Sequence, residues 1–461
     1  MLARTVEDLL RLIRRRQLLP AQEAVSALGI SRPTLMRLVR SAGDAVLPIG
    51  QGRRRAYAAR RPLRGSHAPL PLYRVDASGL AHAVGHLHLA HPSGTWLELS
   101  AAGDGLHWPL AADSPMRDGW FDGIPYFLQD MRPQGFLGRQ FAQTHAAFMQ
   151  VSPNPEHWSD DDTLHVLSIL GTDTSGDFIL GDEALRQWQH HAAQERPIAA
   201  PDIGHTYLQL AQQVLTSGSG GSSAAGEFPK FGALRAQDGQ TARVLVKFSG
   251  TDDSAQTRRW ADLLVCESLA ADVVNTLPGV RGSRSRILQL GGRTLLEVER
   301  FDRHGLHGRS GLCSWAALNG DWFGLAGRPW HEGAARLAAC GLIDADTVQA
   351  IERLVLFGRL IANNDMHDGN LSFQPDAGRL RLAPVYDMLP MAYRPQPGVE
   401  LPEVPFATPT PLPRQRTQWH EAARAALDFW ARAAADLRIS AGFREICARN
   451  AEHLRHAQRL T

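Results

Sequence analysis

The sequence predicts an α+β protein of several domains, in which a small helical module precedes a strand-rich part and a helical C-terminal part. The chain has 461 residues, enough for three domains of about 150 residues each. Its 44% hydrophobic content can give each of them a core. Charge is uneven: residues 1–65 carry fourteen arginines and four acidic residues, a net charge of +10, whereas residues 66–461 carry −8. A basic module at one end is typical of a domain that binds a polyanion.

Composition excludes several classes of protein. Charged residues make up 21% of the chain, and its 42 glycines and 28 prolines are too few for wholesale disorder or a collagen-like repeat. The four cysteines form no C-x-x-C pair, which argues against a structural zinc site and a disulfide framework. No segment has the pattern of a secretory signal or of a membrane-spanning helix. We therefore expect a cytoplasmic protein that does not bind membranes.

Residues 1–45 contain start and stop signals for short helices. Thr5 followed by Asp8 is a capping-box pattern, and an apolar repeat with helical spacing follows it. The boundaries expected for three helices fall at residues with strong terminal preferences: Arg16, Pro20, Gly29, Ser31 and Gly43. Three short helices with a tight turn between the last two are typical of a helix-turn-helix.

A basic helix face and a hairpin complete this module. The third helix has an apolar side and a basic side, and Val46–Ile49 with Arg53–Tyr57 predicts a β-hairpin, the wing of a winged helix. The arginines expected to contact DNA are Arg32, Arg37, Arg40, Arg53, Arg54 and Arg55. The alternative is a protein-interaction domain with a solvated basic face. We favour DNA binding because the charge, the turn and the hairpin coincide.

The middle of the chain predicts short strands, such as Leu72–Val75 and Thr95–Leu99, without visible chemistry. A Gly/Ser-rich run from Thr216 is by itself either a flexible linker or a phosphate-binding loop. The expected strand Ala242–Phe248 follows, and its Lys247 can direct a point charge toward a phosphate. A glycine-rich loop followed by a strand lysine is the order of parts in protein kinases.

Lysine is nearly absent from the chain, because 47 of its 49 basic residues are arginines. Lys230 and Lys247 therefore mark positions where the guanidinium group of an arginine does not replace the ammonium group of a lysine equally well. On the next expected helix, Asp262 and Glu267 are the acids that could pair with Lys247, or both could be ordinary solvated charges. The strand that begins at Arg293 suits a hinge whose backbone amides hold an adenine.

The strongest pattern is the loop Asn364–Phe373, which follows an apolar helical run. Asp365 and Asn370 have the spacing of a phosphotransferase catalytic loop, in which the Asp accepts the hydroxyl proton and the Asn oxygen binds Mg²⁺. A strand expected over Leu380–Asp387 delivers a further carboxylate, and such hard oxygen ligands suit Mg²⁺.

The residues of this loop also fit two alternatives. One is a turn whose Asn and Asp side chains cap their own backbone, and the other is a hydrolytic metal site formed by Asp365, His367 and Asp387. The turn does not explain the upstream lysine, and the hydrolytic site lacks enough histidines at ligand spacing. We therefore favour phosphoryl transfer.

Five segments carry a resemblance to a known family: Leu170–Asp177, Ser223–Lys230, Glu299–Arg303, Asn364–Asn370 and Tyr386–Asp387. In this order they resemble the HipA family of bacterial serine/threonine kinase toxins. The resemblance implies a HipA/protein-kinase-like fold of two lobes, with a β-rich N-lobe and a helical C-lobe. The expected divisions are a helix-turn-helix DNA-binding domain (1–65), a HipA-like β-rich subdomain (66–205) and the kinase core with its helical C-lobe (206–461).

The resemblance also implies roles for individual residues. Asp365, Asn370 and Asp387 would be catalytic, with Asp365 as the base and the other two as Mg²⁺ ligands. The residues implied for the ATP site are Lys247 at the phosphates, Glu299 and Phe301 at the adenine hinge, and Ser223, Gly226 and His367 in two loops. Ser223 would also be a regulatory autophosphorylation site, because a doubly charged phosphate there would displace the loop from its position at the ATP phosphates.

Cofactors and partners follow from the same resemblance. It implies ATP and Mg²⁺ as cofactors, and growth arrest through phosphorylation of a translation component such as an aminoacyl-tRNA synthetase. DNA and an antitoxin are further partners, and the protein would be in the bacterial cytoplasm, nucleoid-associated when bound to DNA. Two other functions stay open: a transcription regulator with a degenerate or ligand-sensing kinase-like domain, and a small-molecule kinase with a similar D-x-H-x-x-N loop.

Overall fold

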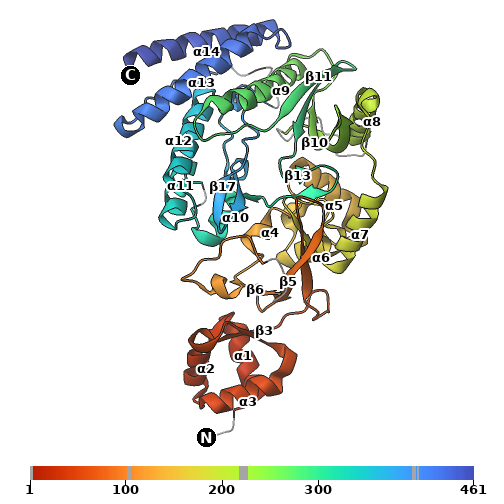
Figure 1. Ribbon diagram of the computed structural model, residues 1–461, viewed down its shortest axis with the longest axis vertical. Helices are drawn as coiled ribbons and strands as arrows, with labels where there is room; N and C mark the ends of the chain where they lie inside the picture. Colours follow the sequence, from red (N-terminus) through yellow and green to blue (C-terminus); the bar gives the residue numbers. More distant parts are fainter. Residues whose placement is uncertain (1–3, 101–104, 217–226, 326, 397–400, 402–403) are drawn as a thin grey trace.

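The computed structural model describes residues 4–100, 105–216, 227–325, 327–396, 401 and 404–461. Figure 1 shows the N-terminal helices at one end of the long axis and the C-terminal helices at the opposite end, with the strand-rich parts between them. Among the helices that the structure describes, none combines the length and the apolar composition that a membrane span requires.

The N-terminal unit, residues 4–65, contains the predicted helices: α1 (Val6–Arg16), α2 (Ala21–Leu28) and α3 (Arg32–Ala42). The predicted capping box is confirmed, since Asp8 N donates to Thr5 Oγ1 over 3.2 Å and Thr5 N donates back to the Asp8 carboxylate over 3.0 Å. The unit's strands, ordered β1-β3-β2, are β1 (Leu19–Pro20), β2 (Val46–Ile49) and β3 (Ala56–Ala59). The predicted hairpin is thus present, although its second strand begins at Ala56 and not at Arg53.

One face of this hairpin packs on the rest of the protein. Leu47, Ile49 and Ala58 form a small apolar cluster with Ala90 and Trp120 of the next sheet. At the hairpin turn, the Arg54 guanidinium makes two hydrogen bonds to the Asp118 carboxylate, of 3.0 and 3.2 Å. The N-terminal unit is therefore docked against its neighbour through both apolar and charged contacts.

The middle region, residues 66–202, is built on an antiparallel sheet with strand order β7-β6-β5-β4-β8. Its strands are β4 (Leu70–Val75), β5 (Ala81–Leu89), β6 (Thr95–Leu99), β7 (Trp120–Phe121) and β8 (Phe178–Leu180). Its helices are α4 (Tyr126–Gln129), α5 (Gly135–Met149), α6 (Asp160–Leu170) and α7 (Asp182–Gln194). The two predicted strands are confirmed in β4 and β6.

The strand-rich lobe, residues 203–216 and 227–299, is an antiparallel sheet between two helices. Its elements are α8 (Ile203–Thr216), β9 (Lys230–Gln237), β10 (Gln240–Phe248), α9 (Ala255–Val273), β11 (Ser285–Leu290) and β12 (Arg293–Glu299), with strand order β11-β12-β10-β9. Tyr207 of α8 packs with Phe248 and Leu295, whereas α9 packs in the core that holds Leu296. Because neighbouring strand residues point to opposite faces, α8 and α9 cover opposite sides of the sheet.

Both hairpins of this sheet use two-residue turns with positive φ. Asp238 (φ 54°) and Gly239 (φ 73°) connect β9 to β10, and Gly291 (φ 55°) and Gly292 (φ 74°) connect β11 to β12. Such turns match the right-handed twist of the strands they join and fix their register. The register of β10, and hence the direction in which Lys247 points, follows from these turns.

The helical lobe follows, and it confirms the predicted helical C-terminal part. Its helices are α10 (Trp315–Trp322), α11 (Trp330–Ala339), α12 (Ala345–Leu360), α13 (Arg416–Ala435) and α14 (Ala441–Leu460). Its short strands are β13 (Arg303–His304), β14 (Gly308–Arg309), β15 (Cys313–Ser314), β16 (Ser372–Asp376) and β17 (Arg379–Leu382). Helix α13 packs on α12, α14 and α9, which joins the two lobes on the side away from the N-terminal unit (Figure 1).

One strand is shorter than predicted. The expected strand Leu380–Asp387 ends at Leu382, and Pro384 follows, which has no N–H group to donate to a ladder. Asp387 therefore lies on an irregular segment beyond the strand. Val385, two residues earlier, forms a parallel bridge with Gly282, which holds this segment against the strand-rich lobe.

Candidate active site

A cavity of about 610 Å³ lies among the two lobes and the middle region, within the size range of small-molecule sites. Lys247 of β10, Glu267 of α9 and Asp387 line it, and so do Glu299 and Phe301 at the end of β12. The fold thus brings together five residues from distant parts of the sequence.

Lys247 forms ion pairs with two carboxylates. Its Nζ lies 2.6 and 2.9 Å from the two carboxylate oxygens of Glu267, and it also donates to Oδ1 of Asp387. The side chains of Lys247 and Glu267 are almost completely buried. Glu267, and not Asp262, is therefore the acid that pairs with Lys247.

Asp262 has a different task, although it lies on the same helix. Its carboxylate accepts hydrogen bonds of 2.7 Å from Ser440 N and 2.6 Å from Ser440 Oγ, and Ser440 is the N-cap residue of α14. Asp262 thus fastens the start of α14 to α9. Its contribution is to the stability of the helical lobe.

The substitution Asp262→Ala is expected to destabilise the protein by about 1–3 kcal/mol, since it leaves the half-buried Ser440 amide without its acceptor. Urea unfolding would measure this loss. The phosphoryl transfer that the sequence predicts should not change per folded molecule, whereas Glu267→Gln should lower it. Equal effects of the two variants on transfer would contradict this division of roles.

Burial and the buried ammonium group of Lys247 act in opposite directions on the pKa values of the two acids. Burial alone would raise the pKa of the Asp387 carboxyl, but the charges of Lys247 and Lys230 outweigh burial and hold this pKa at about 2. Burial raises the pKa of Glu267, and Asp387 acts in the same direction while Lys247 opposes it. Asp387 also has φ 52°, a left-handed conformation that costs energy for a residue with a side chain and is frequent at functional sites.

Lys230 lies directly across the sheet from Lys247. The two are Cα partners in the β9–β10 ladder, and burial, followed by the charge of Lys247, lowers the pKa of Lys230. Sequence reasoning singled out both lysines by their rarity but gave a role only to Lys247. Of the two, Lys247 lines the cavity and Lys230 does not.

The predicted catalytic loop borders the same cavity. Gly369 lines it, and Tyr386 Oη donates a 2.6 Å hydrogen bond to Gly369 O, which ties the loop to the residue before Asp387. Asn370 Nδ2 donates to Asp365 O over 2.9 Å. The structure therefore holds Asn370 against the backbone of Asp365, and not against Asp387.

His367 is exposed, and its Nδ1 accepts a hydrogen bond of 3.1 Å from Gly369 N. Within the described ranges, no group of three or more His, Cys, Asp and Glu side chains could hold a metal ion. A hydrolytic site made of Asp365, His367 and Asp387 therefore has no support. A site for Mg²⁺ on Asn370 and Asp387 would use one amide and one carboxylate oxygen, which is a suitable donor set for this ion.

The predicted hinge residues Glu299 and Phe301 line the same cavity. The Phe301 ring packs against Tyr386, with ring centroids 5.9 Å apart, and Glu299 accepts a 2.7 Å hydrogen bond from Arg235. The Glu299 side chain is thus occupied in the sheet, and its backbone N donates to Arg284 O over 2.8 Å. Tyr386 was not assigned a role from sequence, although it immediately precedes Asp387.

The other predicted site residues lie elsewhere. Arg32, Arg37 and Arg40 are exposed on α3, and Arg53 is exposed at the hairpin. Arg54 instead pairs with Asp118, and the Arg55 guanidinium donates to Pro48 O over 3.1 Å. Ser223 and Gly226 lie outside the described residues.

Comparisons with known proteins agree with this architecture. Residues 222–457 match the family model of the HipA-like C-terminal domain, and residues 66–189 match that of the YjjJ-like toxin, middle domain. The chain is 36% identical over 442 residues to the toxin YjjJ of Escherichia coli (strain K12), which covers 95% of both chains.

Solved structures with detectable similarity include a chain of the toxin–antitoxin complex of HipA, HipB and operator DNA from Shewanella oneidensis MR-1. The TM-score is 0.46 at 14% identity, over 84% of this chain and 95% of that chain. The proinflammatory kinase CtkA of Helicobacter pylori is similar with a TM-score of 0.26 at 16% identity, over 34% of this chain and 52% of that chain.

Proposed function

This chain belongs to the HipA-like toxin family, and on that premise we propose that it is an ATP-dependent protein serine/threonine kinase. The observation that carries the proposal is the contact of Lys247 with Glu267 and Asp387 inside a cavity bordered by the loop of Asp365 and Asn370. A strand lysine paired with a helix glutamate, beside a second acid, is the arrangement that protein kinases use to hold ATP phosphates. The substrate we propose is a component of translation, such as an aminoacyl-tRNA synthetase, whose phosphorylation arrests growth.

Each residue has a task in this reaction. Lys247 binds the phosphates, and Glu267 holds its ammonium group in place. Asn370 and Asp387 are the residues that would hold Mg²⁺, which when bound neutralises negative charge on the phosphates. Asp365 accepts the proton of the attacking hydroxyl group, which is general-base catalysis. The backbone from Glu299 to Phe301 binds the adenine.

The test is incubation of the purified full chain with Mg²⁺ and γ-labelled ATP, alone and with bacterial lysate, beside an Asp387→Ala control. Mass spectrometry would locate every labelled residue. Label on a lysate protein that is absent with the control would support the kinase and identify its target. No label on any protein, with the chain folded, would favour the alternative function of a DNA-binding regulator with a degenerate kinase-like domain.

We also propose that Ser223 is a regulatory autophosphorylation site, with Gly226 in the same phosphate-binding loop and His367 beside the nucleotide. A phosphate on Ser223 would add about two negative charges to the loop and repel it from the acids of the site. The same labelling experiment tests this, since it would detect label on Ser223 in the chain incubated alone. An antitoxin that suppresses the activity is a further proposed partner.

The N-terminal unit is proposed to be a winged helix-turn-helix that binds DNA. The exposed arginines of α3 and the local net charge of +10 support this, because a basic exposed helix can enter a major groove. The protein would then act in the bacterial cytoplasm, on the nucleoid when bound to DNA. The proposed divisions remain 1–65, 66–205 and 206–461, and the second boundary falls in the first turn of α8.

Removal of a DNA-contacting arginine is expected to weaken binding at every salt concentration. For Arg37→Ala and Arg40→Ala, the plot of the logarithm of the DNA-binding constant against the logarithm of the salt concentration should become less steep. Its slope should decrease in magnitude by about 1 per lost phosphate contact. Fluorescence anisotropy with labelled duplex DNA between low and physiological salt would measure this. Arg186→Ala is the matched control, since Arg186 is an exposed arginine of α7 that pairs with Glu183. An unchanged slope in both α3 variants would exclude this surface.

A further inference from the structure

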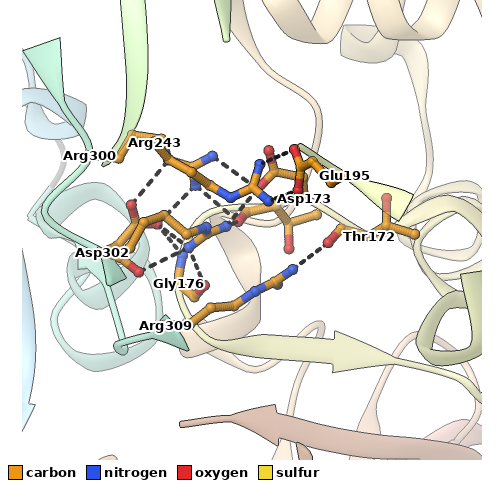
Figure 2. Close-up of polar contacts among 10 residues, drawn as sticks. Thr172, Asp173, Gly176, Glu195, Arg243, Arg300, Asp302 and Arg309 are labelled. Carbon is orange, nitrogen blue, oxygen red and sulfur yellow. Dashed lines mark hydrogen bonds and ion pairs between the residues drawn. The ribbon is translucent and has the colours of Figure 1, made fainter. Parts of the chain in front are cut away.

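A dense set of hydrogen bonds joins the middle region to the segment after β12. Figure 2 shows arginine side chains that lie between Asp302 on one side and Asp173 with Glu195 on the other. Arg300 Nη1 and Arg303 Nη2 both donate to Oδ1 of Asp173, over 3.0 and 2.9 Å. Two loops that are 127 residues apart in sequence are therefore joined by charge-assisted bonds, which are the stronger class of hydrogen bond.

Backbone groups strengthen the same contact. Gly176 N donates to Asp302 Oδ2 over 3.0 Å, and Arg303 Nη1 donates to Gly176 O over 2.8 Å. Arg309 donates to Thr172 O. The segment 172–176 is thus bonded along its length, through side chains and backbone, to residues 300–309.

The contact is both buried and charged. The side chains of Asp302 and Arg303 are 5% and 2% exposed, and burial would raise the pKa of Asp302, but Arg300 and Arg303 hold it at about 2. Asp173 differs, because 53% of its side chain is exposed and it lines the cavity of the candidate active site. Like Asp302, which also lines the cavity, Asp173 contacts both the arginines and the cavity.

Arg300 connects this cluster to the hinge, since it lies between Glu299 and Phe301. Its backbone N donates to Arg243 O over 2.9 Å, which holds the hinge to β10. Its side chain is held from the other side by Asp173 and Asp302. Thr172, Asp173 and Arg300 all line the same cavity.

We propose that the segment 172–176 of the middle region forms part of the nucleotide site, with Asp173 as a positioning residue that acts through Arg300 to fix the hinge backbone at the adenine. This inference rests on the proposed kinase function. The hinge backbone is the part that distinguishes the 6-amino group of adenine from the 6-oxo group of guanine. When the hinge is less firmly held, the protein should therefore lose affinity for ATP and selectivity for ATP over GTP. The geometry of Lys247 at the phosphates should not change.

The experiment compares Asp173→Asn with Glu195→Gln in the full chain. Both substitutions keep the side-chain shape and remove one carboxylate charge, which faces Arg300 and Arg303 at Asp173 and Arg243 at Glu195. Glu195 accepts a 3.0 Å hydrogen bond from Arg243 and is not among the described residues that line the cavity. For Asp173→Asn we expect the KM for ATP to rise about tenfold with kcat within about twofold, the effect on binding alone of weakening the charge-assisted hydrogen bond to Arg300. The preference for ATP over GTP should fall by a similar factor, and Glu195→Gln should change neither value.

A second measurement needs no variant. Hydrogen exchange of the unmodified chain, with and without a non-hydrolysable ATP analogue, should show slower exchange at residues 172–176 and 299–302 when the analogue is bound. Unchanged exchange at 172–176 would overturn the inference, as would an unchanged KM in Asp173→Asn or an equal change in Glu195→Gln. Failure of the unmodified chain to bind the analogue would overturn the proposed function as well. A chain that binds ATP and transfers phosphate, with Asp173→Asn unaffected, would contradict the inference alone.

Discussion

The substitution Asp365→Ala is expected to lower kcat for phosphoryl transfer by about 10²- to 10⁴-fold while leaving the fold intact. The reason is that the carboxylate is the proposed acceptor of the substrate proton. The loop itself should keep its shape, because Asn370 is bonded to the backbone O of Asp365 and not to its carboxylate. Steady-state transfer of label from ATP to the identified protein substrate would measure the change.

Asp368→Ala provides the matched control for Asp365→Ala. Asp368 is an acid of the same loop, but its carboxylate accepts a 3.2 Å hydrogen bond from Asn319 Nδ2, away from the proposed chemistry. We expect its loss to lower stability slightly and kcat by much less than the loss of Asp365. Unchanged turnover in Asp365→Ala, with thermal unfolding as in the unmodified chain, would remove Asp365 as the base.

The substitution Lys247→Met should reduce both phosphoryl transfer and stability. Transfer should fall about 10²- to 10³-fold, because the charge that stabilises the phosphates is lost. Stability should fall by about 3–5 kcal/mol, the typical cost when one partner of a buried ion pair is removed, since Glu267 would stay buried without its cation. Urea unfolding and labelled-ATP transfer would give the two values separately.

The double variant Lys247→Met with Glu267→Gln separates the two effects. It removes the buried negative charge of Glu267 together with the cation, so most of the lost stability should return. Transfer should stay low because no ammonium group faces the phosphates. Recovery of transfer together with stability would mean that the ion pair serves the fold alone.

The parts of the fold that could be predicted are those encoded by local signals. The capping box at Thr5 and the N-cap Ser31 begin α1 and α3 where expected, because a helix end is decided by a few neighbouring residues. The loop from Asp365 to Asn370 was found for a similar reason. The chemistry proposed for this loop depends on two residues, Asp365 and Asn370, that are five positions apart. A spacing this short can be recognised in a single sequence.

The parts that could not be predicted depend on contacts between distant residues. Asp262 and Glu267 lie about 140° apart around one helix, and α9 is buried on nearly all sides, so its hydrophobic pattern did not mark which acid faces the sheet. The same limit applies to Arg54, whose partner Asp118 is 64 residues away. The ion pairs of Asp173 with Arg300 and Arg303 were missed because nothing near Asp173 in the sequence indicates its partners.

The cross-strand pair of lysines has a consequence for how the chain can be cut. A protease that cleaves only after lysine has two sites in the whole sequence, and both lie in the β9–β10 ladder, opposite one another. A protease binds its substrate as an extended, unpaired strand, so β9 and β10 must separate before either bond is accessible. When opening and closing are fast relative to cleavage, the cutting rate follows the population of the opened sheet. Digestion by such an enzyme would thus report the local opening of one sheet. Trypsin could not report it, because trypsin also cleaves after arginine and the chain has 47 arginines.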